Sequence, residues 1–82
     1  MNIQKSAEAV VKAMGGNENI LHVTHCITRL RFKLKDDSIA DRASLQKIEG
    51  VLGSVNAAGS YQVIVGKYVD SFYEEISKQL GN

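Results

Sequence analysis

The feature that most constrains the fold of this chain is a strict alternation of polar and apolar side chains over residues 28–34, in the order Thr-Arg-Leu-Arg-Phe-Lys-Leu. Successive side chains of a β-strand point to opposite faces, so this order predicts a strand with one buried face and one basic, solvent-exposed face. A helix would instead distribute the same residues around its surface. The side chains that we expect to face the core are Thr28, Leu30, Phe32 and Leu34.

Other patterns predict the elements around this strand. Apolar residues at helical spacing predict helices over residues 3–14, 41–48 and 69–80, the first of them capped by Asn2. Valine-rich runs predict further strands over residues 20–24, 51–57 and 61–65, and Asp36 begins a turn. The predicted order is αββαββα.

Two hairpins and three one-faced helices bury their apolar surfaces most economically as an α+β two-layer sandwich. We therefore expect a four-stranded antiparallel sheet with three helices on one face and solvent on the other. A length of 82 residues, with 44% hydrophobic and 23% charged residues, fits one domain spanning residues 1–82, and we expect that domain to be monomeric when isolated.

The composition also excludes some classes of function. The formal net charge of +1 provides no general field for a nucleic acid or an anionic membrane. No run of about 20 apolar residues is present to cross a bilayer, and the charged N-terminal segment does not resemble a secretory signal. The single cysteine forms no internal disulfide, which favours a reducing cytoplasm.

Cys26 lies just before a ladder of alternating basic residues. The members of the ladder are Arg29, Arg31, Lys33 and Lys35. We expect Cys26 in or beside the first hairpin turn, close to the two arginines. A thiol attacks as its thiolate, and nearby guanidinium groups lower its pKa and can hold phosphate oxygens in a fixed geometry. The pattern therefore indicates a nucleophilic cysteine assisted by Arg29 and Arg31.

A plainer interpretation of the same residues stays open. A lone cysteine is often an inert, buried residue, and alternating basic side chains are often only a solvated sheet face. Cys26 also shares even numbering with the core-facing Leu30, so a strand that continued unbroken would bury the thiol. A turn over residues 25–27 would resolve this difficulty.

Metal binding and nucleic-acid binding are both weakly indicated. His22, His25 and Cys26 lack a fourth zinc ligand, and adjacent residues of a strand point apart, so we expect neither a metal ion nor a cofactor. A nucleic-acid-binding module could use the face of Arg29 and Arg31, but no stacking aromatic residues accompany them, and we expect no nucleic-acid partner. His25 has either no catalytic duty or a role in proton handling or partner contact.

The region around Cys26 resembles a known motif. Asn19-Ile20 is followed after five residues by Cys-Ile-Thr-Arg-Leu-Arg-Phe-Lys-Leu-Lys-Asp over residues 26–36. This is similar to the phosphorylation-site motif of the enzyme IIB domains in the glucose and sucrose families of the bacterial sugar phosphotransferase system. No residue of the segment departs from that motif. Segments beginning at Gly50 and Tyr61 are also similar to the family's second hairpin.

The resemblance implies a phosphoryl relay, and hence a protein-phosphocysteine sugar phosphotransferase. A phosphohistidine on enzyme IIA would donate to Cys26, and the phosphocysteine would donate to a sugar held by the membrane enzyme IIC. Residues matching Arg29 and Arg31 are associated in the family with transfer to the sugar, and Thr28 would shape the loop through hydroxyl bonds to the backbone. The family fold is also αββαββα.

The histidine before the cysteine resembles the β-glucoside, sucrose, trehalose and N-acetylmuramate branch. Sugar choice is expected to reside in enzyme IIC. The chain would act at the cytoplasmic face of the bacterial membrane, as a free subunit or, as we prefer, as a domain excised from a longer transporter. A regulatory module, in which phosphorylation of Cys26 serves signalling, is the remaining alternative.

Overall fold

The computed structural model describes residues 1–81; residue 82, the last of the predicted domain, lies outside them. Within residues 1–81 the chain forms three α-helices and four β-strands, with short 3-10 turns between them. The helices are α1 (Ile3–Ala13), α2 (Arg42–Leu45) and α3 (Val69–Gln79), and the strands are β1 (Ile20–His25), β2 (Arg29–Leu34), β3 (Gly53–Ala57) and β4 (Ser60–Ile64). The predicted order αββαββα is confirmed.

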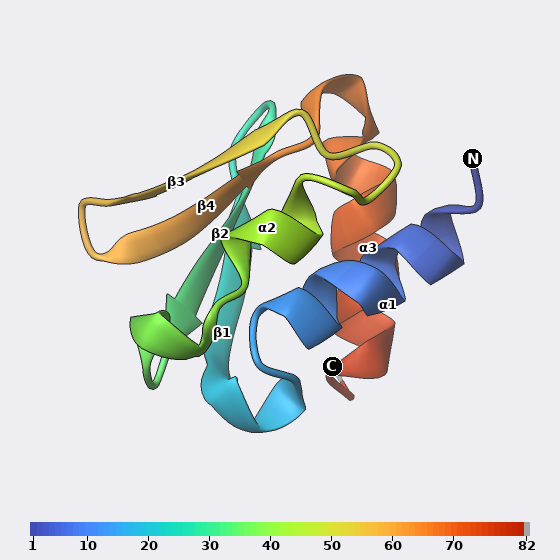
Figure 1. Ribbon diagram of the computed structural model, residues 1–82. Coiled ribbons are helices and arrows are strands. Elements are labelled where there is room, and N and C mark those ends of the chain that lie inside the picture. Colours follow the sequence, from blue (N-terminus) through green and yellow to red (C-terminus); the bar gives the residue numbers. More distant parts are fainter. Residues whose placement is uncertain (82) are drawn as a thin grey trace.

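The strands form one antiparallel sheet in the order β1-β2-β4-β3 across the described residues. Two sequential hairpins, β1–β2 and β3–β4, are joined through the pairing of β2 with β4, in which Leu30 lies opposite Val63 and Phe32 opposite Tyr61. The helices cover one face of this sheet (Figure 1). The predicted α+β sandwich with an open sheet face is therefore correct.

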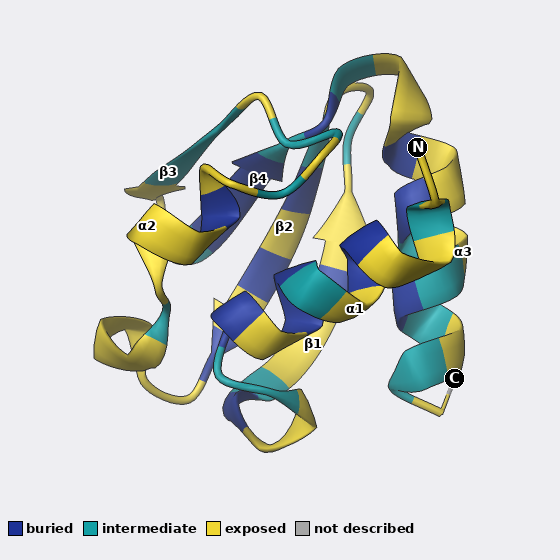
Figure 2. Ribbon diagram, turned by 45° about the vertical axis from the view of Figure 1, so that its right-hand side comes forward, coloured by how far each residue is buried: buried dark blue, intermediate teal, exposed yellow. Residues whose placement is uncertain are grey.

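The core lies between β2 and β4 on one side and α1 and α3 on the other (Figure 2). Leu30 and Phe32 have no exposed surface and Leu34 is 8% exposed, as the alternation predicted. The same prediction was wrong for Thr28, which is exposed. The strand begins one residue later, at Arg29, because Thr28 belongs to the turn that joins β1 to β2.

Two other elements are shorter than predicted by two residues or more, whereas α1 and α3 each end one residue early. The α-helix predicted over residues 41–48 ends at Leu45, because beyond it the backbone bonds join residues three apart, as from the Ile48 N–H to the Leu45 carbonyl at 3.1 Å. The third strand starts at Gly53 and not at residue 51. Val51 still belongs to the preceding turn, since its N–H donates to the Ile48 carbonyl.

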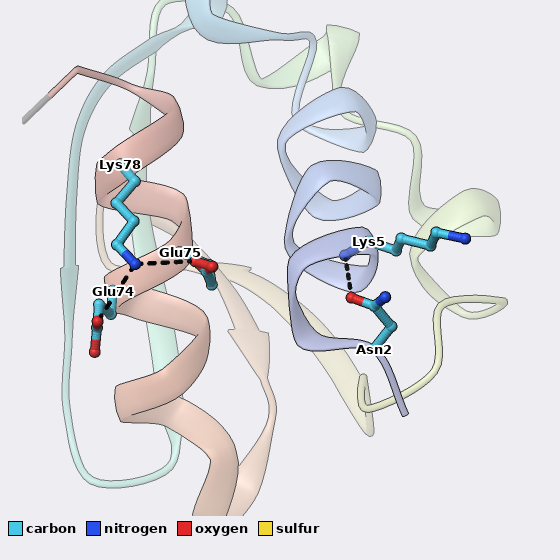
Figure 3. Close-up of polar contacts among 5 residues, drawn as sticks. All are labelled: Asn2, Lys5, Glu74, Glu75 and Lys78. Carbon is cyan, nitrogen blue, oxygen red and sulfur yellow. Dashed lines mark hydrogen bonds and ion pairs between the residues drawn. The ribbon is translucent and has the colours of Figure 1, made fainter.

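The two long helices carry local stabilising contacts at their ends (Figure 3). The Asn2 side chain accepts a bond of 3.1 Å from the Lys5 N–H, which confirms the predicted N-cap of α1. In the last turns of α3, Lys78 lies 3.5 Å from Glu74 and 3.6 Å from Glu75. Such exposed pairs contribute only about 0.3–0.5 kcal/mol each.

Across residues 1–81, no helix combines the length and the apolar character that a membrane span requires.

A buried amide joins the end of the first helix to the end of the first hairpin. The Asn19 side chain, 4% exposed, donates to the carbonyls of Met14 at 2.7 Å and of Asp36 at 3.0 Å, and accepts from the Asp36 N–H at 3.0 Å. It therefore satisfies backbone groups from two segments far apart in the sequence. An unsatisfied buried group of this kind costs about 1–3 kcal/mol.

Replacing this amide should destabilise the domain. We expect Asn19→Ala to lower the free energy of unfolding by about 2–3 kcal/mol, because it leaves backbone groups of Met14 and Asp36 without partners. Urea denaturation followed by circular dichroism measures this change. Asn56→Ala is the matched control, since its exposed amide makes a single bond of 3.3 Å, and it should change stability by less than about 0.5 kcal/mol. Equal losses in the two variants would contradict the assignment.

Candidate functional site

Cys26 is the first residue of the turn that joins β1 to β2. His25 is the last paired residue of β1, opposite Leu30, and the Cys26 N–H then donates to the Arg29 carbonyl at 2.9 Å. The thiol is partly exposed, and Ile27 at the tip of the turn is 88% exposed. The predicted position of Cys26 in the first hairpin turn is confirmed.

The pairing register explains why the thiol is not buried. In β1 the inward residue Val23 has an odd number and pairs with the even-numbered Phe32 of β2, so the numbering of inward residues changes across the hairpin. Residues that pair directly share a face of the sheet. Cys26, which is hydrogen-bonded opposite Arg29, therefore lies on the outer face with the arginines, and the conflict over even numbering disappears.

The surroundings of the thiol favour its ionised form. The pKa of Cys26 is lowered to about 7, and the largest cause is the backbone N–H of Thr28, which donates to the sulfur. Partial burial opposes this shift, whereas the backbone N–H of Arg29 reinforces it. The Arg31 guanidinium lowers the pKa further, both as a hydrogen-bond donor and as a positive charge. The thiolate is therefore a substantial form of Cys26 near neutral pH.

Thr28 contributes main-chain atoms to the site. Its carbonyl accepts bonds of 3.0 Å from the N–H groups of both Val65 and Gly66, just after β4. Gly66 has a φ of +61°, and a side chain there would crowd Leu52 at 3.3 Å, so this backbone conformation favours glycine. These bonds fix the peptide between Thr28 and Arg29, whose N–H is that of Arg29 and also lowers the pKa of Cys26. The loop-shaping role of the Thr28 hydroxyl stays a prediction.

The two arginines are held differently. The Arg31 side chain is exposed and acts on Cys26 directly. The Arg29 side chain is half-buried, and its Nη1 donates to Gln62 Oε1 at 3.0 Å. Gln62 is 6% exposed, and its own amide donates to Ser60 Oγ at 3.3 Å, so it is fixed from two sides. Arg29 therefore acts on the thiol through its backbone N–H, while its guanidinium is oriented on the sheet face.

The two lysines of the basic ladder lie farther along. Lys33 is exposed on the outer face and pairs with His22, and Lys35 follows the end of β2. Neither lysine is among the groups that lower the pKa of Cys26. The structure thus brings the turn over residues 26–28 and Arg31 together in one cluster, with Arg29 beside it. The two lysines remain exposed to solvent on the sheet face.

Sequence reasoning missed three features of this site. The first is the pair of backbone N–H groups at the sulfur, which no side-chain pattern indicates. The second is Gln62, whose signal was available, because it is the polar residue within the valine-rich segment 61–65. The third is a contact between His25 and Tyr73 of α3, whose ring centroids are 4.6 Å apart.

The surface beside the thiol is hollowed. An open cavity of about 390 Å³ is lined by the turn and by the start of α3, namely by His25, Cys26, Ile27, Val69 and Asp70. No group of three His, Cys, Asp or Glu side chains that could hold a metal ion occurs in the described part of the chain. The arrangement suits a thiolate that reacts with an anionic group brought by a partner.

Comparisons with known proteins identify the family. The model of the family "phosphotransferase system, EIIB" matches residues 8–41. The crystal structure of one domain of the phosphotransferase-system IIabc component from Clostridium difficile superposes with a TM-score of 0.87 and 36% identity, covering 93% of this chain and 80% of that one. This chain belongs to the EIIB family. The resemblance inferred from the sequence is therefore confirmed.

Curated relatives are longer proteins. The chain is 45% identical over 80 residues to the trehalose-specific EIIBC component of Bacillus subtilis, covering 96% of this chain and 17% of that protein. It is 45% identical over 75 residues to the arbutin-, cellobiose-, and salicin-specific EIIBC component of Escherichia coli, covering 92% and 16%. This EIIB chain thus spans about one sixth of the length of these relatives.

The ionisation of Cys26 can be measured by its alkylation. Because iodoacetamide reacts with the thiolate, its rate should rise as the pH passes upward through about 7 and level off above it. Arg31→Gln should move this midpoint upward, since it removes a donor and a positive charge. Lys33→Gln, on the same face, should leave the midpoint unchanged. A wild-type midpoint in the ordinary thiol range would contradict the described environment.

Proposed function

We propose that residues 1–82 form the phosphoryl-carrier domain of a sugar transporter of the phosphotransferase system. Cys26 accepts a phosphoryl group from a phosphohistidine of an EIIA protein and passes it to a sugar held by a membrane EIIC protein. The relatives named as EIIBC components, which combine EIIB and EIIC, support this assignment of partners and a location at the cytoplasmic membrane face. The observation that carries the proposal is the thiol at the hairpin tip, surrounded by the N–H groups of Thr28 and Arg29 and by Arg31.

Acceptance is a substitution at phosphorus. The Cys26 thiolate attacks the phosphorus atom, an S–P bond forms, and the P–N bond to the donor imidazole breaks. The electron pair of the broken bond stays on the imidazole nitrogen, which takes up a proton from the surroundings. A thiol pKa of about 7 keeps much of the protein in the reactive form, so no separate general base is needed at the sulfur.

Donation uses the same groups in the reverse sense. The sugar hydroxyl oxygen attacks phosphorus, the S–P bond breaks, and the electron pair returns to sulfur. Since the N–H groups of Thr28 and Arg29 stabilise a thiolate, they also make Cys26 a good leaving group. The hydroxyl proton must pass to a base that the EIIC side provides.

The arginines are suited to the phosphoryl group itself. The phosphocysteine carries about two negative charges near neutral pH, by analogy with other phosphorylated residues. Arg31 lowers the pKa of Cys26 as a donor and as a charge, whereas the Arg29 guanidinium is held by Gln62 on the outer face of the sheet. Two planar donors from one strand can bind separate phosphate oxygens. Their charge should matter most when a docked partner excludes water.

An apolar collar around the turn supports docking of partners at this end. It consists of Ile27 (88% exposed), Leu52 (75%) and Tyr68 (40%). Leu52 lies close to Gly66, whose N–H donates to the Thr28 carbonyl. The collar therefore lies next to the turn that contains Cys26. Exposed apolar side chains beside a reactive group fit transient protein contacts that expel water.

The alternative of nucleic-acid binding has less support. Phe32 and Tyr61 are buried on the core face and are unavailable for stacking nucleic-acid bases.

Phosphorylation of Cys26 can be tested by intact-protein mass spectrometry. After incubation with phosphoenolpyruvate, enzyme I, the histidine carrier protein and a panel of EIIA domains, the wild type should gain one phosphate. Cys26→Ser should gain none, because a serine hydroxyl does not ionise near neutral pH. Circular dichroism checks that both proteins are folded. Absence of an adduct on a folded wild type with every EIIA tested would refute the carrier function.

The arginines should matter for delivery more than for acceptance. With an EIIC partner in membrane vesicles, we expect Arg29→Lys and Arg31→Lys to slow transfer to the sugar by about 10- to 100-fold, the equivalent of one lost charge-assisted hydrogen bond. Above the thiol pKa, where Cys26 is ionised in all variants, acceptance from EIIA should stay within about threefold of wild type. Lys33→Ala should deliver normally. Normal delivery by both arginine variants would contradict this division.

A further inference from the structure

The Cys26 end of the turn has a contact that the transfer chemistry above does not use. His25 Nδ1 lies 3.0 Å from the Cys26 carbonyl oxygen. A carbonyl oxygen only accepts hydrogen bonds, so Nδ1 carries the proton and donates it. The bond therefore holds the peptide between Cys26 and Ile27 in one orientation.

The His25 ring also contacts a residue of helix α3. His25 has the same strand parity as the buried Val23, so its side chain lies on the face covered by α3. There its ring meets the ring of Tyr73, with centroids 4.6 Å apart and planes inclined by 57°. Tyr73 is half-buried and packs against the core. A tilted aromatic contact of this kind is favourable and directional.

The two ends of the turn are thus fixed by different parts of the fold. The Thr28 end is bound to the segment after β4 by two backbone bonds of 3.0 Å, to Val65 and Gly66. The Cys26 end has the hairpin bond to Arg29 and the His25 contact. Rotation of the peptide after Cys26 would change the direction of the N–H groups two and three residues on, which are those that face the sulfur.

We propose that His25, seated on Tyr73, is a positioning residue that holds the turn so that the backbone N–H groups of Thr28 and Arg29 point at the Cys26 sulfur. This assigns to His25 an orienting role through Nδ1, which donates to the Cys26 carbonyl. The proposal deepens the carrier function, but its first consequence, the ionisation of Cys26, is independent of any partner or sugar.

The test compares variants by iodoacetamide alkylation of Cys26 over a range of pH. His25→Ala should raise the midpoint above the wild-type value of about 7 and slow alkylation about two- to fivefold at a pH one unit below that midpoint. His25→Asn, which offers an amide N–H near the position of Nδ1, should recover most of the rate. The matched control is His22→Ala, an exposed histidine of the same strand, which should behave as wild type.

Tyr73 provides a second arm. Tyr73→Phe keeps the ring and should leave the midpoint unchanged, whereas Tyr73→Leu should raise it in the same direction as His25→Ala. Amide chemical shifts of Thr28 and Arg29 in ¹⁵N-labelled protein should move in His25→Ala and return toward wild type in His25→Asn. Circular dichroism verifies that each variant is folded.

The outcomes separate this proposal from the carrier function. A wild-type midpoint and unchanged Thr28 and Arg29 shifts in folded His25→Ala would overturn the positioning role, even if Cys26 accepts phosphate. Failure of His25→Asn to improve on His25→Ala would also overturn it, because the donated bond would then be irrelevant. If the midpoint shifts as expected but wild-type Cys26 accepts no phosphate, the positioning role stands and the carrier function fails.

Discussion

The site depends on the register of the β1–β2 hairpin. Burial of Leu30 and Phe32 fixes which face of β2 meets the helices, and the pairing of Val23 with Phe32 transmits that choice to β1. Cys26 then lies on the opposite, polar face beside the arginines. A slip of one residue would exchange the faces, expose the core side chains and bury the thiol. The hydrophobic core is therefore also what exposes the nucleophile.

The thiol is activated mainly by main-chain dipoles. The N–H of Thr28 contributes more to the lowered pKa than the charge of Arg31 does. Backbone donors in a turn anchored to β4 lose little conformational freedom when they bind a charged sulfur, whereas an exposed arginine side chain loses more. This arrangement lets the group stay accessible to large partners and still ionise near neutral pH. The ionisation of Cys26 therefore also depends on the residues that orient the turn.

Much of the fold followed from periodicity. The alternation over residues 28–34 predicted β2 and its two faces, and the helical stripes predicted α1 and α3 with their ends nearly in place. The errors lie at Thr28, at the end of α2 and at the start of β3, where turns compete with regular structure. At α2 and β3 local turns with bonds between residues three apart replace the regular pattern, whereas Thr28 is bound by another segment, through Val65 and Gly66. A local pattern contains no information about such partners.

The sequence by itself determined the order of the elements, the buried face of β2 and the proximity of Cys26 to Arg29 and Arg31, because period-two and helical patterns are local properties. Only the tertiary structure decided that the backbone N–H of Thr28 faces the sulfur, that Gln62 holds Arg29 and that Tyr73 meets His25. The last two contacts join residues of different strands and helices, and the first depends on a turn that the segment after β4 anchors. Their geometry exists only once the core has fixed the sheet against the helices.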